Sequence, residues 1–185
     1  MDRTYNMDWR SQLNPITEQF QEEFSSLNES ELNWKPSAKI WSIAEILTHI
    51  IQVNESYYPS FQQIIDGTYK APFTGKFGFL VNMFGNAILK SMHPTQKRKT
   101  KTMLIWEPSK SDEERDIVDQ FVQHQSAMKD WIVKLDPYIA STLISSPANS
   151  NIVYKLSTCL EIIVAHEKRH FIQACEVKLK LPKIT

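Results

Sequence analysis

The chain has 185 residues, of which 42% are hydrophobic and 23% charged, and its 21 basic residues balance its 21 acidic residues. This length suits a single domain, 1–185, with a buried core, and the neutral balance excludes the global electrostatic field that recruits nucleic acid. We therefore expect no nucleic-acid partner. Because no apolar run reaches the roughly 18 residues of a membrane span, we also expect no membrane partner.

The first predicted helix begins near Pro15. Asn14 is a typical helix cap and proline suits the first helical position, although residues further upstream could form an earlier turn. Apolar residues then recur at steps of three and four, which places them on one helical face. This face comprises Leu13, Ile16, Phe20, Phe24 and Leu27. Residues 27–39 are predicted to be a connection.

The second predicted helix has a well-defined start. The sequence SIAE at 42–45 is a capping box, in which Ser42 caps the helix and Glu45 bonds back to the amide of the cap residue. Pro59 is expected to interrupt this helix, because proline has no N–H to donate to the helical ladder. Gly67 is a plausible final stop.

Residues 68–110 are predicted to be an insertion between the second and third main helices. They include an apolar, glycine-interrupted stretch that favours a short helix at about 78–91, followed by a loop with the basic sequence KRKTK at 97–101. A charge run of this kind is more often a solvated loop than a phosphate site.

Two more long helices complete the pattern. Capping-box sequences predict helix starts at 111–114 (SDEE) and 158–161 (TCLE), and the last helix is expected to run to about Lys180. The dipeptide at 136–137 (DP) ends the third helix, and 145–151 is predicted to be a turn-rich loop. The whole pattern predicts an all-α fold, a four-helix bundle with one inserted short helix and loop.

Two histidines lie one turn apart on the last predicted helix. His166 and His170 share a helical face with Ile163 and Ala174, so both are expected to point into the bundle. An i, i+4 histidine pair can bind one cation, and the sequence HEKRH formally matches the HExxH pattern of zinc proteases, with Glu167 at the general-base position. A protease of that class needs a third ligand downstream, and no histidine follows His170.

A third ligand must therefore come from another helix. His49 is the strongest candidate, because it occupies an inward or boundary position on the second helix, whereas His93 and His124 are poorer candidates. Three neutral imidazoles suit zinc, nickel or a similar divalent metal. The alternative is a set of polar residues without a metal, which would leave buried donors and acceptors to satisfy.

These motifs resemble those of the DinB-like proteins. The sequence LNWKPSAKIWSIAEILTHI at 32–50 resembles their second-helix signature, AHEKRHFIQA at 165–174 resembles their last-helix pattern His-x-x-x-His-x-x-Gln, and WEPS at 106–109 is also similar. The resemblance implies a DinB/YfiT-like four-helix bundle, which is commonly a homodimer. It also implies a zinc or nickel site formed by His49, His166 and His170.

The same resemblance implies an activity. The better-characterised relatives are thiol-dependent S-transferases, which use bacillithiol or mycothiol, and a maleylpyruvate isomerase. A low-molecular-weight thiol and a small electrophilic substrate are therefore expected. The alternatives are a hydrolase that uses a metal-bound hydroxide and a non-catalytic metal-binding stress-response protein. Cys159 and Cys175 are expected to be core residues, so the protein offers no nucleophile of its own. Without a CxxC pattern or a signal sequence, we expect a reduced, cytoplasmic protein.

Several residues are candidates for supporting roles. Glu45 precedes His49 by one turn and could fix its tautomer, or serve only as the helix cap. Gln173 could orient an imidazole, touch substrate or be a polar boundary residue. Glu167 is expected to form a salt bridge or face solvent rather than act as a base, and Arg169 matches an arginine of the DinB-like last helix. The candidates for lining a cavity, with core packing as the alternative, are Trp41, Tyr57 and Tyr58.

Overall fold

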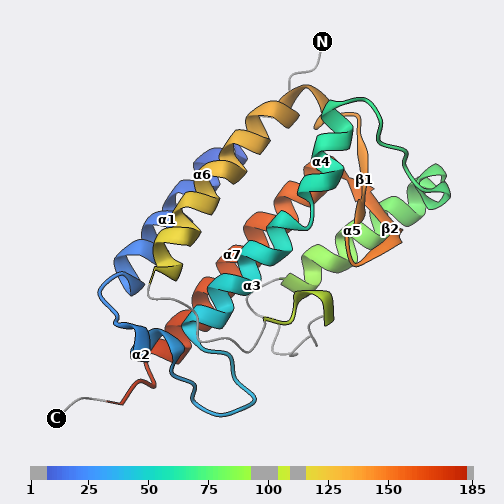
Figure 1. Ribbon diagram of the computed structural model, residues 1–185. Coiled ribbons are helices and arrows are strands. Elements are labelled where there is room, and N and C mark those ends of the chain that lie inside the picture. Colours follow the sequence, from blue (N-terminus) through green and yellow to red (C-terminus); the bar gives the residue numbers. More distant parts are fainter. Residues whose placement is uncertain (1–7, 93–103, 109–115, 183–185) are drawn as a thin grey trace.

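Four long helices lie side by side in the computed structural model, which describes residues 8–92, 104–108 and 116–182 (Figure 1). They are α1 (Trp9–Phe24), α3 (Ile43–Glu55), α6 (Ile117–Leu135) and α7 (Leu156–Lys178). The α3 and α7 helices are adjacent and antiparallel, and α1 and α6 form the opposite side of the bundle. The all-α prediction is confirmed, apart from one small hairpin.

In the described ranges, eight further elements connect these four helices. They are α2 (Glu29–Asn33), α4 (Tyr58–Ile65), η1 (Phe73–Lys76), α5 (Gly78–Met92), η2 (Leu104–Trp106), η3 (Asp136–Tyr138), β1 (Leu143–Ser146) and β2 (Asn149–Lys155). The α5 helix is the predicted inserted helix, and it packs against β2 and α7. The basic sequence at 97–101, His93 and the predicted helix start at 111–114 lie outside the described residues.

The predicted start of the second helix is confirmed. The Ser42 side chain accepts a hydrogen bond from the amide of Glu45, and the Glu45 carboxylate accepts one from the amide of Ser42, at 3.1 and 2.8 Å. The chain then breaks between α3 and α4, with Pro59 in the first turn of α4. Gly67 adopts a positive φ of 69°, which is the backbone conformation of a glycine helix stop.

The helix start predicted at Thr158 is wrong, and the first helix starts upstream of Pro15, as the stated alternative has it. The α1 helix begins at Trp9, capped by Asp8, so Pro15 lies inside it. Trp9 is buried and extends the apolar face by one turn, and its packing outweighs the hydrogen bond that proline removes. The α7 helix begins at Leu156 rather than at Thr158. The amide of Leu156 donates a hydrogen bond to the carbonyl of Thr142, which precedes β1. No side chain of the described residues caps the helix.

The predicted loop at 145–151 is instead part of a β-hairpin. The β1 and β2 strands pair antiparallel, with Ile144 opposite Tyr154, and both of these side chains are buried. Residues 147–148 form the turn between the strands, so the range 145–151 contains a turn as predicted, but its other residues belong to the two strands of the hairpin. Because β2 runs directly into α7, the hairpin determines where α7 enters the bundle.

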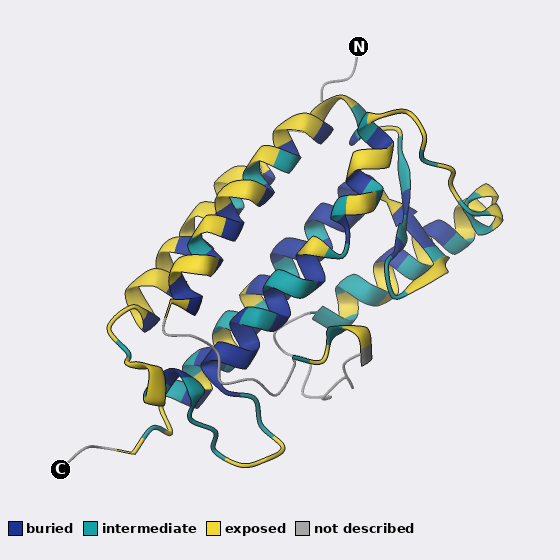
Figure 2. Ribbon diagram, in the orientation of Figure 1, coloured by how far each residue is buried: buried dark blue, intermediate teal, exposed yellow. Residues whose placement is uncertain are grey.

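The buried faces of the long helices point toward one another and form a single core (Figure 2). Phe20 of α1 packs against Phe121 of α6 and Phe171 of α7, with ring centroids 4.6 and 5.2 Å apart. A fully buried phenylalanine contributes about 1.5–3 kcal/mol to stability. Within the described residues, no helix is both long enough and apolar enough to cross a bilayer.

Candidate metal centre

The structure brings three histidines together in the core. His49 comes from α3, and His166 and His170 come from α7; their exposed fractions are 3%, 6% and 8%. One ring nitrogen of each lies within 4.8 Å of those of the other two. Three buried histidines this close could hold a divalent metal ion.

A main-chain carbonyl fixes the orientation of the His49 ring. Its Nδ1 lies 2.8 Å from the carbonyl oxygen of Trp106 in η2, and because a carbonyl only accepts, Nδ1 carries the proton. The unprotonated Nε2 then faces Nε2 of His166 at 3.1 Å. Two nitrogen ligands of a tetrahedral zinc are about 3.3 Å apart when each Zn–N bond is about 2.0–2.1 Å, so this spacing fits a shared ion.

Burial keeps the three imidazoles neutral. Desolvation lowers the pKa of His49, and it lowers the pKa of His166 still further, with His170 and His49 adding to that effect. Desolvation also lowers the pKa of His170 to about 3. Neutral imidazoles carry the lone pairs that a metal needs. The Nδ1 atoms of His166 and His170 are buried and have no hydrogen-bond partner among the described residues.

Trp41 covers one side of the cluster. Its ring lies 4.8 Å from the His49 ring and stacks at 6.2 Å on the His170 ring, measured between centroids. Trp41 is half-buried, and it immediately precedes the cap residue of α3. Of the three aromatic residues named as cavity candidates, Trp41 is the one that contacts the clustered histidines.

Tyr57 and Tyr58 lie in other surroundings. The Tyr57 hydroxyl is hydrogen-bonded to that of Tyr154 at 2.6 Å, in the core beneath the hairpin. The Tyr58 hydroxyl lies 3.3 Å from Nδ1 of His124, and its ring stacks on the same imidazole. These contacts correspond to the packing alternative for both tyrosines.

Glu45 and Gln173 take different positions relative to the cluster. The Glu45 carboxylate caps α3 and forms an ion pair of 2.6 Å with Lys35, so the capping alternative describes it. The partner of His49 is the Trp106 carbonyl instead. Gln173 contacts His170, and this contact opposes the lowering of the His170 pKa by burial.

Arg169 links α7 to the inserted helix. Its guanidinium donates a hydrogen bond of 2.7 Å to the carbonyl of Ser91, in the last turn of α5. A cation is favourable at this negative end of a helix. The positive charge of Arg169 also lowers the pKa of His166 and of His170.

The expectation for Glu167 is wrong. Its side chain is fully buried instead of facing solvent, and it accepts a hydrogen bond of 2.8 Å from the Asn54 amide. Burial raises the pKa of Glu167 to about 7. Its long side chain reaches toward the N-terminal end of α7, as helical side chains do, and this direction carries it between α3 and α6.

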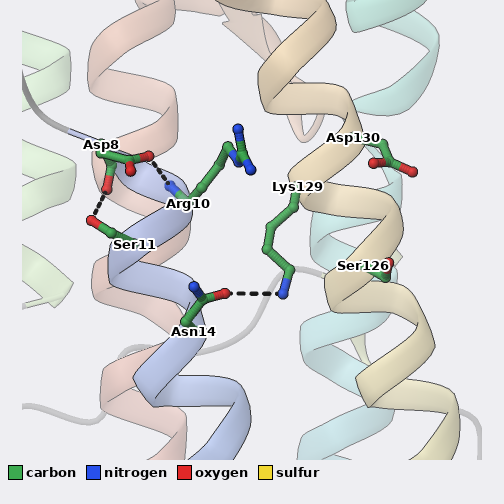
Figure 3. A pocket seen from close by; sticks show the side chains of 7 residues that line it. All are labelled: Asp8, Arg10, Ser11, Asn14, Ser126, Lys129 and Asp130. Atoms are coloured by element: carbon green, nitrogen blue, oxygen red, sulfur yellow. Dashed lines mark hydrogen bonds between the residues drawn. The ribbon is translucent and has the colours of Figure 1, made fainter.

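A separate hollow of about 320 Å³ lies between the start of α1 and α6 (Figure 3). Its lining is polar, with Asp8 capping α1 and Lys129 donating a hydrogen bond of 3.0 Å to Asn14. None of the three clustered histidines lines it, so the hollow is no part of the candidate metal centre.

Comparison with known proteins identifies one family. The family model of the DinB superfamily matches residues 12–174, a range that includes all three clustered histidines. No curated protein and no solved structure matches the chain.

Proposed function

The chain belongs to the DinB superfamily, and from this premise we propose that it is a metal-dependent enzyme with His49, His166 and His170 as ligands of zinc or nickel. The observation that supports the ligand set is the buried cluster, in which one nitrogen of each ring lies within 4.8 Å of the others. Three neutral nitrogen donors suit these borderline metals, and they leave room for an outside molecule in the coordination sphere.

The proposed reaction is the transfer of a low-molecular-weight thiol to a small electrophile. The thiol loses its proton to water, its sulfur forms a bond to the electrophilic carbon, and the leaving group departs with the electrons of the broken bond. A bound divalent ion supplies the Lewis acidity that makes a thiol or water acidic at neutral pH. The chain's part is to hold three ligands in place and to cover the site with Trp41.

The cysteines support a nucleophile from outside the chain. Cys159 is fully buried, and burial raises the pKa of its thiol well above the usual range. Burial also raises the pKa of the half-buried Cys175. Thiols that stay protonated are poor nucleophiles. Both cysteines are free, which fits the reducing cytoplasm that we propose as the location.

Metal content of the purified protein tests the ligand set. The wild-type chain is expected to hold one divalent ion per chain, and His166→Ala is expected to lose it. Glu23→Ala is the control, since it breaks the ion pair between Glu23 and Lys178, which lies outside the cluster. Equal metal content in the wild type and His166→Ala would refute the proposed site.

A thiol-transfer assay tests the chemistry. The metal-loaded protein is incubated with a fluorogenic electrophile, with and without a low-molecular-weight thiol, and consumption that requires the thiol supports the transferase. Turnover without thiol would indicate a metal-dependent hydrolase. Metal binding without turnover under either condition would indicate a non-catalytic metal-binding protein.

We also propose that the protein is a homodimer. An exposed apolar cluster at the start of α5 supports this, because clusters of this kind mark association surfaces. Its residues, with exposed fractions of 41–69%, are Phe73, Phe77, Phe79 and Met83. Sedimentation velocity is expected to show a dimer for the wild type and a monomer for Phe79→Asp. A wild-type monomer at micromolar concentration would refute the proposal.

A further inference from the structure

A second set of polar side chains is buried beside the histidine cluster. Asn54 lies on α3, His124 and Gln125 on α6 and Glu167 on α7, and none of the four is more than 6% exposed. Burying an amide, an imidazole and a carboxyl group in an apolar bundle is costly unless they bond to one another. The proposed reaction uses none of these residues, so their presence in the core needs another explanation.

Asn54 is the centre of this network. Its amide nitrogen donates to the Glu167 carboxylate at 2.8 Å and lies 3.2 Å from Nε2 of His124. The two N–H groups of one amide therefore serve both partners, and His124 accepts through Nε2. Nδ1 of His124 then carries the proton and faces the Tyr58 hydroxyl at 3.3 Å.

The bond between Asn54 and Glu167 joins the same two helices that supply the histidines. Asn54 shares α3 with His49, and Glu167 directly follows His166 on α7. Glu167 and His166 are neighbours on one helix, about 100° apart around its axis. Because the helix turns as a unit, a rotation of α7 that displaces Glu167 also displaces His166. The orientation of the ligand is thus coupled to this one hydrogen bond.

We propose that Asn54 and Glu167 are a positioning pair for the metal centre: their hydrogen bond fixes the rotation of α7 against α3 and thereby the approach of His166 to His49. This inference rests on the proposed metal site. The pair touches no ligand atom, so it acts through the placement of the helices. Loss of an outer partner that hydrogen-bonds a ligand directly weakens metal binding about 10–100-fold, and this range is the upper limit for a pair that acts through the helices.

The test compares four proteins by their affinity for Co²⁺, measured on the full-length chain by competition with a chromogenic chelator. Asn54→Leu removes the donor at similar size, and Asn54→Asp places a second carboxylate against Glu167. Asn54→Leu is expected to weaken binding by up to about 10–100-fold, and Asn54→Asp by less, because two carboxyl groups can share a proton. The double variant Asn54→Asp with Glu167→Gln reverses the bond and is expected to restore near wild-type affinity.

The reversal works because every partner can exchange its role. The new amide at position 167 donates to the new carboxylate at position 54, and His124 takes its other tautomer, so that Nε2 donates and Nδ1 accepts from Tyr58. Rescue by this double variant shows that Asn54 and Glu167 act through each other, since two independent destabilising changes would add.

Glu23→Ala is the matched control. It breaks the ion pair of 2.8 Å between Glu23 and Lys178, which also ties α7 to another helix, and it is expected to leave the Co²⁺ affinity unchanged. The visible spectrum of bound Co²⁺ provides a second readout. Asn54→Asp is expected to change its intensity, and the double variant to recover it.

The outcomes separate the two proposals. A wild-type chain that binds no Co²⁺ refutes the metal site itself. A wild type that binds, together with a folded Asn54→Leu variant of equal affinity, refutes the positioning pair alone. If both single variants fail to fold, the double variant decides: failure to bind Co²⁺ overturns the pair, and recovered binding supports it.

Discussion

Replacing His124 by glutamine should change the response of the protein to acid. His124 is 6% exposed, and desolvation by the surrounding core lowers its pKa to about 4 from the ordinary value of 6.5. The unfolded chain therefore binds a proton at this residue between about pH 6.5 and 4, while the folded chain does not. Stability contributed by neutral His124 is complete above pH 6.5 and falls as the pH decreases toward 4.

The magnitude follows from the two pKa values. At pH 5, a residue that titrates at 6.5 when unfolded and near 4 when folded disfavours folding by about 2 kcal/mol, and at pH 7.5 by almost nothing. His124→Gln removes this titration but retains an oxygen to accept from Asn54. The stability lost between pH 7.5 and pH 5 should thus be about 2 kcal/mol smaller in the variant than in the wild type.

Urea unfolding at the two pH values, with a chelator present, measures this difference. Titrating groups that contact neither His124 nor its partners act equally on both proteins and cancel in the comparison. A pH-independent offset between the proteins is expected from the altered hydrogen bond to Asn54. Parallel loss of stability in both proteins would refute the reasoning, because it would mean that His124 titrates in the folded chain as it does in the unfolded chain.

Three further predictions concern packing, thiol reactivity and the metal. A Cβ on Gly85 of α5 would lie 2.9 Å from the Thr158 methyl group, so Gly85→Val should lower the free energy of unfolding by about 1–3 kcal/mol in a urea titration, and unchanged stability would contradict this close approach. A maleimide should label half-buried Cys175 in the native protein but Cys159 only after unfolding, as peptide mapping would show. Zinc at 100 times its dissociation constant should stabilise the wild type by about 2.7 kcal/mol and leave His166→Ala unaffected in thermal unfolding.

The parts of the site that follow from helical spacing could be predicted from the sequence. His166 and His170 are one turn apart on an otherwise apolar face, and His49 follows the Ser42 capping box at a position that faces inward. Periodicity and caps are local signals, so they locate side chains on a helix face before the fold is known. The resemblance to DinB-like proteins implies the same three histidines as ligands, and the structure places them together.

Other features depended on contacts distant in sequence. Pro15 has a strong local preference for a helix start, but the burial of Trp9 extends α1 past it. The α7 helix has no side-chain cap, because β2 delivers its first residue directly. The burial of Glu167 depends on Asn54, which lies on another helix. Acidic residues next to a basic one usually face solvent, and only the packed bundle reveals this exception.

The hydrogen bond that orients His49 has a consequence for which sequence changes the site tolerates. Its imidazole is oriented by the peptide carbonyl of Trp106, a group that almost any amino acid at that position would present, whereas the indole bonds to Ser56 at 3.2 Å and packs against the core. Another residue could therefore replace tryptophan at position 106 while the imidazole keeps its anchor. A deletion or insertion of a single residue there would shift the carbonyl along the backbone. The hydrogen bond to His49 therefore constrains the position of residue 106 in the chain more than it constrains the side chain there.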